Sequence, residues 1–186
     1  MHKIQRVSLF FRVLFQIAFI VLPVALVLFW LNGPNPIVLS PVTEASSGVE
    51  ITFIPKSIHI MHAVSGMEKF YGFLITLIPT GIDLLTLYFL IKLFRLYEKG
   101  EIFTISNVRY LRNIAYTLLV GELINPIYQG LISGAMTWHN PPGHRFASIG
   151  FDGTDFGIIL LTLFIILISW IMAEGCKLRE EQQLTI

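Results

Sequence analysis

Two carboxyl groups inside apolar stretches are the residues of this sequence best suited to chemistry. Asp83 lies nine residues before Lys92, and Glu122 lies ten residues after Arg112, which places each about 14–15 Å along a helix from a basic residue. An ionised carboxylate in the hydrocarbon core costs about 2.5–3.5 kcal/mol, so such a group is neutral, paired or in contact with water. With the polar residues on the same helix faces they form a candidate intramembrane site: Thr80, Asp83, Glu122, Asn125 and Gln129.

This candidate site has two interpretations. Two carboxylates brought together by neighbouring helices share a proton or bind a cation, which is typical of a small proton- or cation-coupled transporter subunit. When protonated, the same groups hydrogen-bond between helices and only hold them together. The sequence does not show whether Asp83 and Glu122 meet, so both interpretations stay open.

Histidines provide a second candidate site, in two loops that we expect on the outer side of a membrane. Neutral imidazole coordinates Zn²⁺ and copper, so a metal sensor on the outer face is a further hypothesis. It requires the two loops to meet. The alternative is a set of solvated histidines that titrate near neutral pH. The four residues are His59, His62, His139 and His144.

The composition indicates a membrane protein and excludes several other classes. Of the 186 residues, 54% are hydrophobic and only 13% are charged, too few charges to cover the surface of a water-soluble domain. A formal charge of +1 does not fit a nucleic-acid-binding surface. The single Cys176 forms no internal disulfide. No phosphate-binding glycine loop, nucleophile elbow or zinc-protease motif is present, so we expect no enzyme and no cofactor.

Four stretches are long and apolar enough to cross the roughly 30 Å hydrocarbon core as helices: residues 13–31, 71–94, 113–134 and 156–173. The first lacks an Ala-x-Ala-like cleavage site, so we interpret it as an uncleaved helix rather than a signal peptide. The third is the most polar. The sequence thus predicts an all-α integral membrane protein with one four-helix domain over residues 1–186. It has outer loops at 32–70 and 135–155, a cytoplasmic turn at 95–112 and a cytoplasmic tail at 174–186.

Alternation of polar and apolar residues indicates a short sheet in the outer loops. Residues 49–54 and residues 145–151 both alternate in part. Because alternation at period two is typical of a strand with one wet face, we expect these two segments to pair as a two-stranded sheet outside the membrane.

The positions of the basic residues predict the orientation. Ten of the 13 lysines and arginines fall on the side of the two termini and of the turn at 95–112. By the positive-inside rule this side is cytoplasmic, which describes a multi-pass protein of the bacterial inner membrane with both termini inside.

The turn at 95–112 has the features of a helix end followed by a helix start. Gly100 can take the left-handed conformation that ends a helix, and Thr104 or Ser106 can cap a new helix over residues 107–112. The turn is either an interfacial elbow or a docking site for a cytoplasmic partner. The residues that would form the docking site are Tyr97, Gly100, Glu101, Phe103 and Arg109.

The turn and the tail carry a resemblance to a known family. The matching features are the order of four spans, the segments at 93–97, 99–104 and 107–109, and the ending at 184–186. On these the chain resembles the bacterial membrane-protein family catalogued as domain of unknown function 2975. The resemblance implies a four-helix inner-membrane protein, and it implies no activity or catalytic residues.

We therefore expect a non-enzymatic membrane protein that acts as an accessory, sensor or regulatory subunit. Its surroundings are the lipid bilayer, and its partner is a second copy of the chain or another membrane protein. The transporter subunit and the outer-face metal sensor are the alternatives.

Overall fold

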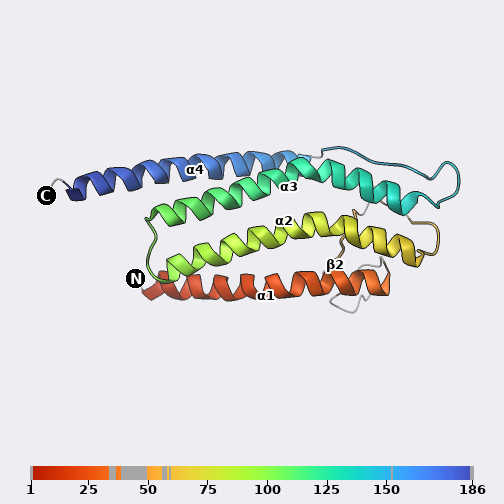
Figure 1. The fold of residues 1–186 in the computed structure, drawn as a ribbon, viewed down its shortest axis with the longest axis horizontal. Helices are drawn as coiled ribbons and strands as arrows, with labels where there is room; N and C mark the ends of the chain where they lie inside the picture. Colours follow the sequence, from red (N-terminus) through yellow and green to blue (C-terminus); the bar gives the residue numbers. More distant parts are fainter. Residues whose placement is uncertain are drawn as a thin grey trace, which may run out of the picture. The chain divides into compact units, whose positions relative to one another are not determined.

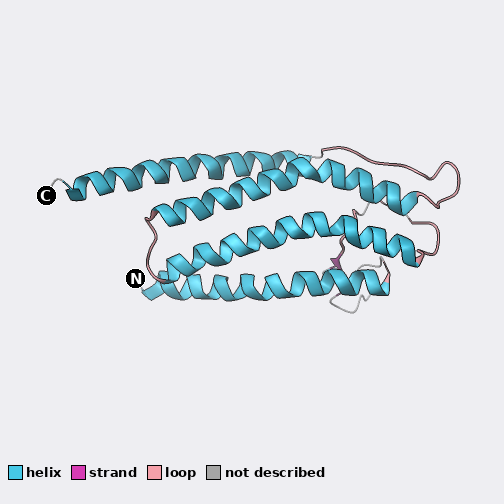
Figure 2. Ribbon diagram, in the orientation of Figure 1, coloured by secondary structure: helices cyan, strands magenta, loops and turns pink. Residues whose placement is uncertain are grey.

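Four long helices dominate the computed structural model, which describes residues 2–33, 37–38, 50–55, 58, 60–151 and 153–184 (Figure 1). They are α1 (His2–Asn32), α2 (Gly66–Glu98), α3 (Ile105–Thr137) and α4 (Gly153–Leu184). Two strands of two residues each, β1 (Ile37–Val38) and β2 (Glu50–Ile51), lie between α1 and α2 in the sequence (Figure 2). The predicted order of four helices is confirmed.

Three of these helices can cross a membrane, judged by length and composition alone. They cover Ile4–Asn32, Gly66–Glu98 and Gly153–Arg179. The helix α3 is as long as α2, with 33 residues each, but it is the most polar, as the sequence indicates. All four helices extend beyond the predicted spans, and α4 continues through the charged tail to Leu184.

The turn between α2 and α3 follows the prediction at Gly100 and departs from it afterwards. Gly100 has φ +82°, and the N–H groups of Gly100 and Glu101 donate to the carbonyls of Tyr97 and Leu96, both at 3.0 Å. This is the Schellman arrangement that ends a helix. Thr104 then caps α3, because its Oγ1 accepts the N–H of Asn107 at 3.3 Å. The predicted short helix at 107–112 is the first part of α3 and not a separate element.

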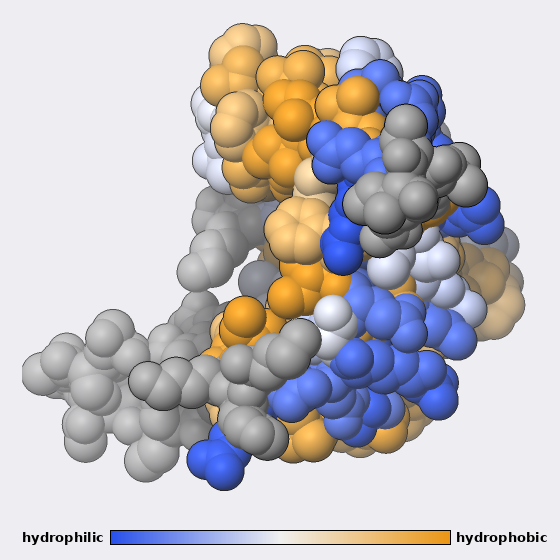
Figure 3. Space-filling view, turned by 90° about the vertical axis from the view of Figure 1, so that its left-hand side faces the viewer, coloured by the Kyte–Doolittle hydropathy of each residue, from blue (hydrophilic) through white to orange (hydrophobic). Residues whose placement is uncertain are grey.

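The chain forms two compact units. The first unit comprises Met1–Ile20, Gly81–Leu123 and Phe151–Ile186, and the second comprises Val21–Thr80 and Ile124–Gly150. In the first unit an ion pair of 2.6 Å joins Arg12 of α1 to Glu98 of α2. Figure 3, which faces the end that carries both termini, shows hydrophilic side chains gathered beside hydrophobic ones.

The second unit contains a hydrophobic core built from α1, α3 and the segment before α2. Its buried members are Leu26, Phe29, Trp30, Ile54, Tyr128, Ile132 and Met136. The Trp30 indole N–H donates to Thr76 Oγ1 of α2 at 2.9 Å, and the Tyr128 hydroxyl donates to the Phe53 carbonyl. These two bonds satisfy buried polar groups and tie α2 and the preceding segment to the core.

The predicted sheet exists in part, but its predicted partner is wrong. The strand β2 lies inside the predicted segment 49–54 and pairs antiparallel with β1, Ile37 opposite Ile51. Described residues of the segment 145–151 form no strand, because side chains of α3 take its backbone hydrogen bonds. Thr137 Oγ1 accepts the N–H of Phe146 and donates to its carbonyl, and Ser133 Oγ accepts the N–H of Ser148.

Candidate metal centre

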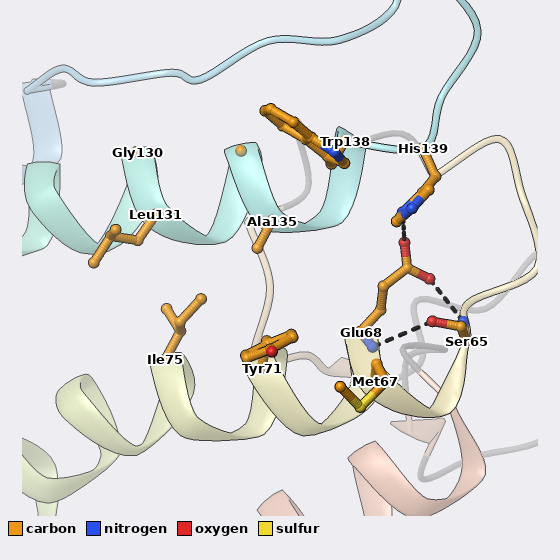
Figure 4. A pocket seen from close by; sticks show the side chains of 11 residues that line it. Ser65, Met67, Glu68, Tyr71, Ile75, Gly130, Leu131, Ala135, Trp138 and His139 are labelled. Atoms are coloured by element: carbon orange, nitrogen blue, oxygen red, sulfur yellow. Dashed lines mark hydrogen bonds and ion pairs between the residues drawn. The ribbon is translucent and has the colours of Figure 1, made fainter.

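A cluster of two histidines and one carboxylate lies in the second unit, where α2 begins and α3 ends. Figure 4 shows two of its members, Glu68 and His139. His62 is in the segment that leads into α2, Glu68 is in the first turn of α2, and His139 follows the last turn of α3. A tight turn holds His139 in place, since the N–H of Asn140 donates to the Thr137 carbonyl at 3.0 Å. The cluster therefore depends on the packing of α2 against α3.

Glu68 is fixed by a capping box at the start of α2. Its N–H donates to Ser65 Oγ at 3.3 Å, and its Oε2 accepts the N–H of Ser65 at 2.7 Å. This reciprocal pair is the S-x-x-E arrangement that satisfies two free N–H groups at a helix N-terminus. The cap occupies Oε2 and leaves the other oxygen, Oε1, to the two histidines, of which Figure 4 shows His139.

Both imidazoles approach this one oxygen. His62 Nε2 lies 2.9 Å from Glu68 Oε1, and His139 Nδ1 lies 2.6 Å from it. The side chains of His62 and Glu68 are 18% and 8% exposed, whereas that of His139 is 63% exposed. The centre thus has two sheltered donors and one donor at its open side.

The hydrogen bonds of Asn140 determine which nitrogen of His62 carries a proton. Asn140 Oδ1 accepts the N–H of Met61 at 3.0 Å, while its Nδ2 donates to the His144 carbonyl at 3.1 Å. Because Oδ1 is an acceptor, His62 Nδ1, also 3.0 Å away, must donate to it. Neutral His62 therefore presents the Nε2 lone pair to Glu68, which is the form that binds a metal ion.

The same contacts raise the pKa of His62 above its ordinary value of 6.5. The hydrogen bond with Asn140 has the largest effect, burial acts in the opposite direction, and the Glu68 carboxylate adds both a hydrogen bond and a charge. Two lone-pair atoms, His62 Nε2 and Glu68 Oε1, cannot sit 2.9 Å apart without a cation between them. That cation is a proton or a metal ion.

The donor set fits a transition-metal ion. One donor atom from each of His62, Glu68 and His139 lies within 4.8 Å of the others. Zinc binds imidazole nitrogen and carboxylate oxygen at about 2.0–2.2 Å, so an ion among these donors would replace the two hydrogen bonds to Glu68 Oε1 and rearrange the three side chains around itself. The Asn140 amide oxygen supplies the outer hydrogen bond that orients a ligating histidine.

An apolar pocket of about 520 Å³ adjoins the cluster. Glu68 and His139 form part of its wall together with Ser65, and apolar side chains of α2 and α3 form most of the rest (Figure 4). A cavity of this size is in the range of small-molecule sites, which are mostly apolar with a few polar groups.

Comparison with known protein families matches residues 28–186 to the family described as Protein of unknown function (DUF2975). The chain belongs to this family. No curated protein and no solved structure matches the chain. The resemblance found in the sequence is confirmed, and the function of this DUF2975 protein has to come from its own residues.

Among the four predicted histidines of this DUF2975 protein, the structure brings together two. His62 and His139 meet at Glu68. His144 is exposed and contributes only backbone groups, because its N–H donates to the Pro141 carbonyl and its own carbonyl accepts from Asn140. The turn at Pro141 keeps it outside the cluster of His62, Glu68 and His139, and its role as a ligand stays a prediction. His59 lies outside the described residues.

The sequence reasoning missed Glu68, although a signal was present. Ser65 and Glu68 have the spacing of a capping box directly before an apolar helix, so a carboxylate fixed at the start of α2 was predictable. Its position between two histidines was not predictable, because the histidines are 77 residues apart in the sequence.

The five residues of the intramembrane candidate fall in different units. Asp83 and Glu122 belong to the first unit, where Asp83 is exposed and Glu122 is half-buried. Their helices pack closely, since a Cβ on Gly121 would lie 3.0 Å from Ile82 Cγ2. Thr80, Asn125 and Gln129 belong to the second unit. Thr80 is buried and donates to the Thr76 carbonyl of its own helix.

The residues of the candidate docking turn all lie in the first unit. Phe103, Glu101 and Arg109 are exposed, whereas Tyr97 and Gly100 are half-buried. Tyr97 packs its ring against Phe94 at a centroid distance of 5.6 Å. The exposed residues of this DUF2975 protein's turn therefore include the apolar Phe103 and charges of both signs.

Proposed function

We propose that this DUF2975 protein is an integral membrane protein that binds a divalent transition-metal ion, with Zn²⁺ as the best fit, through His62, Glu68 and His139. The observation that carries the proposal is the convergence of three donor atoms within 4.8 Å. A helix cap holds Glu68 at the start of α2, and a turn holds His139 just after the end of α3.

Zinc suits this donor set better than the hard cations. Two imidazoles and one carboxylate are ligands of zinc, copper, iron and nickel, whereas Mg²⁺ and Ca²⁺ prefer oxygen alone. Zinc imposes no geometry of its own and accepts three protein ligands with a water in the fourth position. The absence of a thiolate also fits, because the single Cys176 belongs to the other unit.

The proposal places the metal on the outer side of a bacterial inner membrane. We take α3 as the fourth span, since its 33 residues reach about 50 Å and it connects two helices that can cross a membrane. The exposed basic residues of the first unit support cytoplasmic termini under the positive-inside rule: Arg6, Arg95, Lys99, Arg109, Lys177 and Arg179. The second unit, with the metal centre, then faces outward.

We further propose that the metal has a sensing or accessory role and not a catalytic one. Among the described residues that line the pocket beside the cluster, the polar groups other than the two metal ligands are Ser65, the Tyr71 hydroxyl and the Trp138 indole N–H, and none of them is a general base at neutral pH. Catalysis by a zinc-bound water needs a further general base in reach, as well as the metal. A sensor acts through a partner, either a second copy or another membrane protein, and the exposed Phe103 of the docking turn is where that contact is expected.

Isothermal titration of the purified chain with Zn²⁺ tests this function. We expect one ion per chain, with binding weakened more than tenfold in His62→Ala and in His139→Ala. The matched control is His144→Ala, which removes an exposed histidine from the same loop and should leave the affinity unchanged. Asn140→Ala should weaken binding about 10- to 100-fold through loss of the orienting hydrogen bond. Equal zinc binding by the wild type and the His62→Ala, His139→Ala double variant would refute the proposal.

A further inference from the structure

The pocket beside the cluster has one polar end and a long apolar remainder. Its polar end is the wall formed by Ser65, Glu68 and His139. From there it extends between α2 and α3 over side chains that Figure 4 shows on both sides of the space. They are Met67, Tyr71, Ile75, Leu131, Ala135 and Trp138. A cavity of this form accommodates a molecule with a polar head and an apolar chain.

The coordination shell of the proposed metal is open toward this pocket. Three protein donors leave one position of a tetrahedral zinc ion free. The second polar atoms of two ligands are already hydrogen-bonded, since His62 Nδ1 donates to Asn140 and Oε2 of Glu68 accepts the Ser65 N–H. The pocket wall includes the other two ligands, Glu68 and His139, so the fourth ligand reaches the ion from the pocket.

The charge of the loaded centre favours an anionic head. A divalent ion with one carboxylate ligand and two neutral imidazoles carries a net charge of +1. The guanidinium of Arg145 adds a positive charge nearby, because its Nε donates to the Asn140 carbonyl at 2.8 Å. The head group must also be a metal ligand, and carboxylate oxygen binds zinc.

We propose that the metal centre and the apolar pocket together bind an aliphatic monocarboxylate. Its carboxylate takes the fourth coordination position, and its single chain lies between α2 and α3. This inference rests on the proposed function, because the head group binds through the metal. It makes the chain a sensor of a free fatty-acid-like ligand and makes the metal a part of the ligand site.

Cobalt substitution provides a direct measurement, because the visible absorption of bound Co²⁺ changes when its coordination changes. The full-length chain, held in an amphipathic polymer and loaded with Co²⁺, is titrated with acetate, butanoate, hexanoate and octanoate. We expect each acid to change the spectrum and the affinity to rise by up to about fourfold for each added methylene, until the chain fills the pocket. Hexyltrimethylammonium has the same chain with a cationic head and should leave the spectrum unchanged.

Two variants of α3 test the pocket separately from the metal. Ala135→Phe places a ring in the pocket one helical turn before His139, so it should keep Co²⁺ binding and lose the gain in affinity with chain length. Leu131→Ala enlarges the pocket and should move the optimum toward longer chains. The series on the wild type is decisive even if one variant fails to fold.

The outcomes separate the two claims. A chain that binds no Co²⁺ or Zn²⁺ overturns the proposed function and this inference together. A chain that binds Co²⁺ but gives octanoate and acetate equal affinity overturns this inference and leaves the metal centre standing. Tighter binding of hexyltrimethylammonium than of hexanoate also overturns it, because the pocket would then recognise a cation.

Discussion

Replacing Gly72 by alanine is the most direct test of how the second unit is packed. A Cβ at position 72 would lie 1.9 Å from Cη2 of Trp30, and two more ring carbons would lie within 2.6 Å. Trp30 is 4% exposed, so its ring has no solvent to move into. The ring must shift as a whole, and the indole N–H then leaves Thr76 Oγ1, its partner at 2.9 Å.

The expected loss follows from these contacts. Overpacking a filled core costs about 1–3 kcal/mol, and a buried N–H without its acceptor costs about 1–3 kcal/mol. Alanine returns about 0.5–1 kcal/mol as a better helix former than glycine. We expect Gly72→Ala to lower the free energy of unfolding by about 3 kcal/mol, a factor of roughly 150 in the folded-to-unfolded ratio.

The assay is reversible unfolding in mixed micelles, followed by circular dichroism. Gly81→Ala is the matched control, because it lies in the same helix and its added Cβ meets nothing within 4 Å. The control should be neutral or more stable than the wild type by up to about 1 kcal/mol. If the free energy of unfolding of Gly72→Ala is within about 0.5 kcal/mol of the wild-type value, the Trp30 ring does not pack on Gly72 and the reasoning fails.

Two further predictions concern titration and the turn. The pKa of His62 is raised above 6.5, chiefly by the hydrogen bond with Asn140, so in the metal-free protein His62 should contribute stability that is fully present below pH 6.5 and is lost as the pH rises through the folded-state pKa. The melting temperature measured against pH should show this fall. If the same fall is measured in His62→Gln, its assignment to His62 is contradicted. Gly100→Ala should cost about 1–2 kcal/mol in the same micelle assay because of the left-handed φ of +82°. Equal stability of Gly100→Ala and wild type would mean that the turn is not fixed there.

The helices were predictable because hydropathy and capping are local signals. The apolar runs identified all four helices, and Gly100 and Thr104 marked the turn between α2 and α3. The helices extend beyond the predicted spans, because polar residues such as Glu68 and Asn107 continue a helix when a cap satisfies its free N–H groups.

Pairings between distant segments were not predictable. Alternation of residues 145–151 indicated a strand, but it could not reveal that Thr137 and Ser133 of α3 take the hydrogen bonds of this segment. The strand β2 pairs instead with β1, which is close to it in the sequence. Closing a short loop costs less conformational entropy than closing a long one.

The sequence predicted which type of side chain forms the candidate metal centre, but not which residues come together there. Histidines in two loops indicated a metal site, and the structure brings His62 and His139 together with Glu68 in a cluster whose donor atoms could hold an ion. Which histidines meet depends on how α2 and α3 end, and the turn after Thr137 selects His139 over His144. Sequence distance alone carries no information on this choice.

X-ray absorption spectroscopy of the zinc-loaded protein tests the metal centre most directly, because it reports the atoms bound to the ion. Our account predicts two imidazole nitrogens and carboxylate oxygen at about 2.0–2.2 Å from zinc, with no sulfur. It also predicts one imidazole fewer in His62→Ala and no change in His144→Ala. A spectrum without imidazole, or one that His62→Ala leaves unchanged, would contradict a metal site at His62, Glu68 and His139.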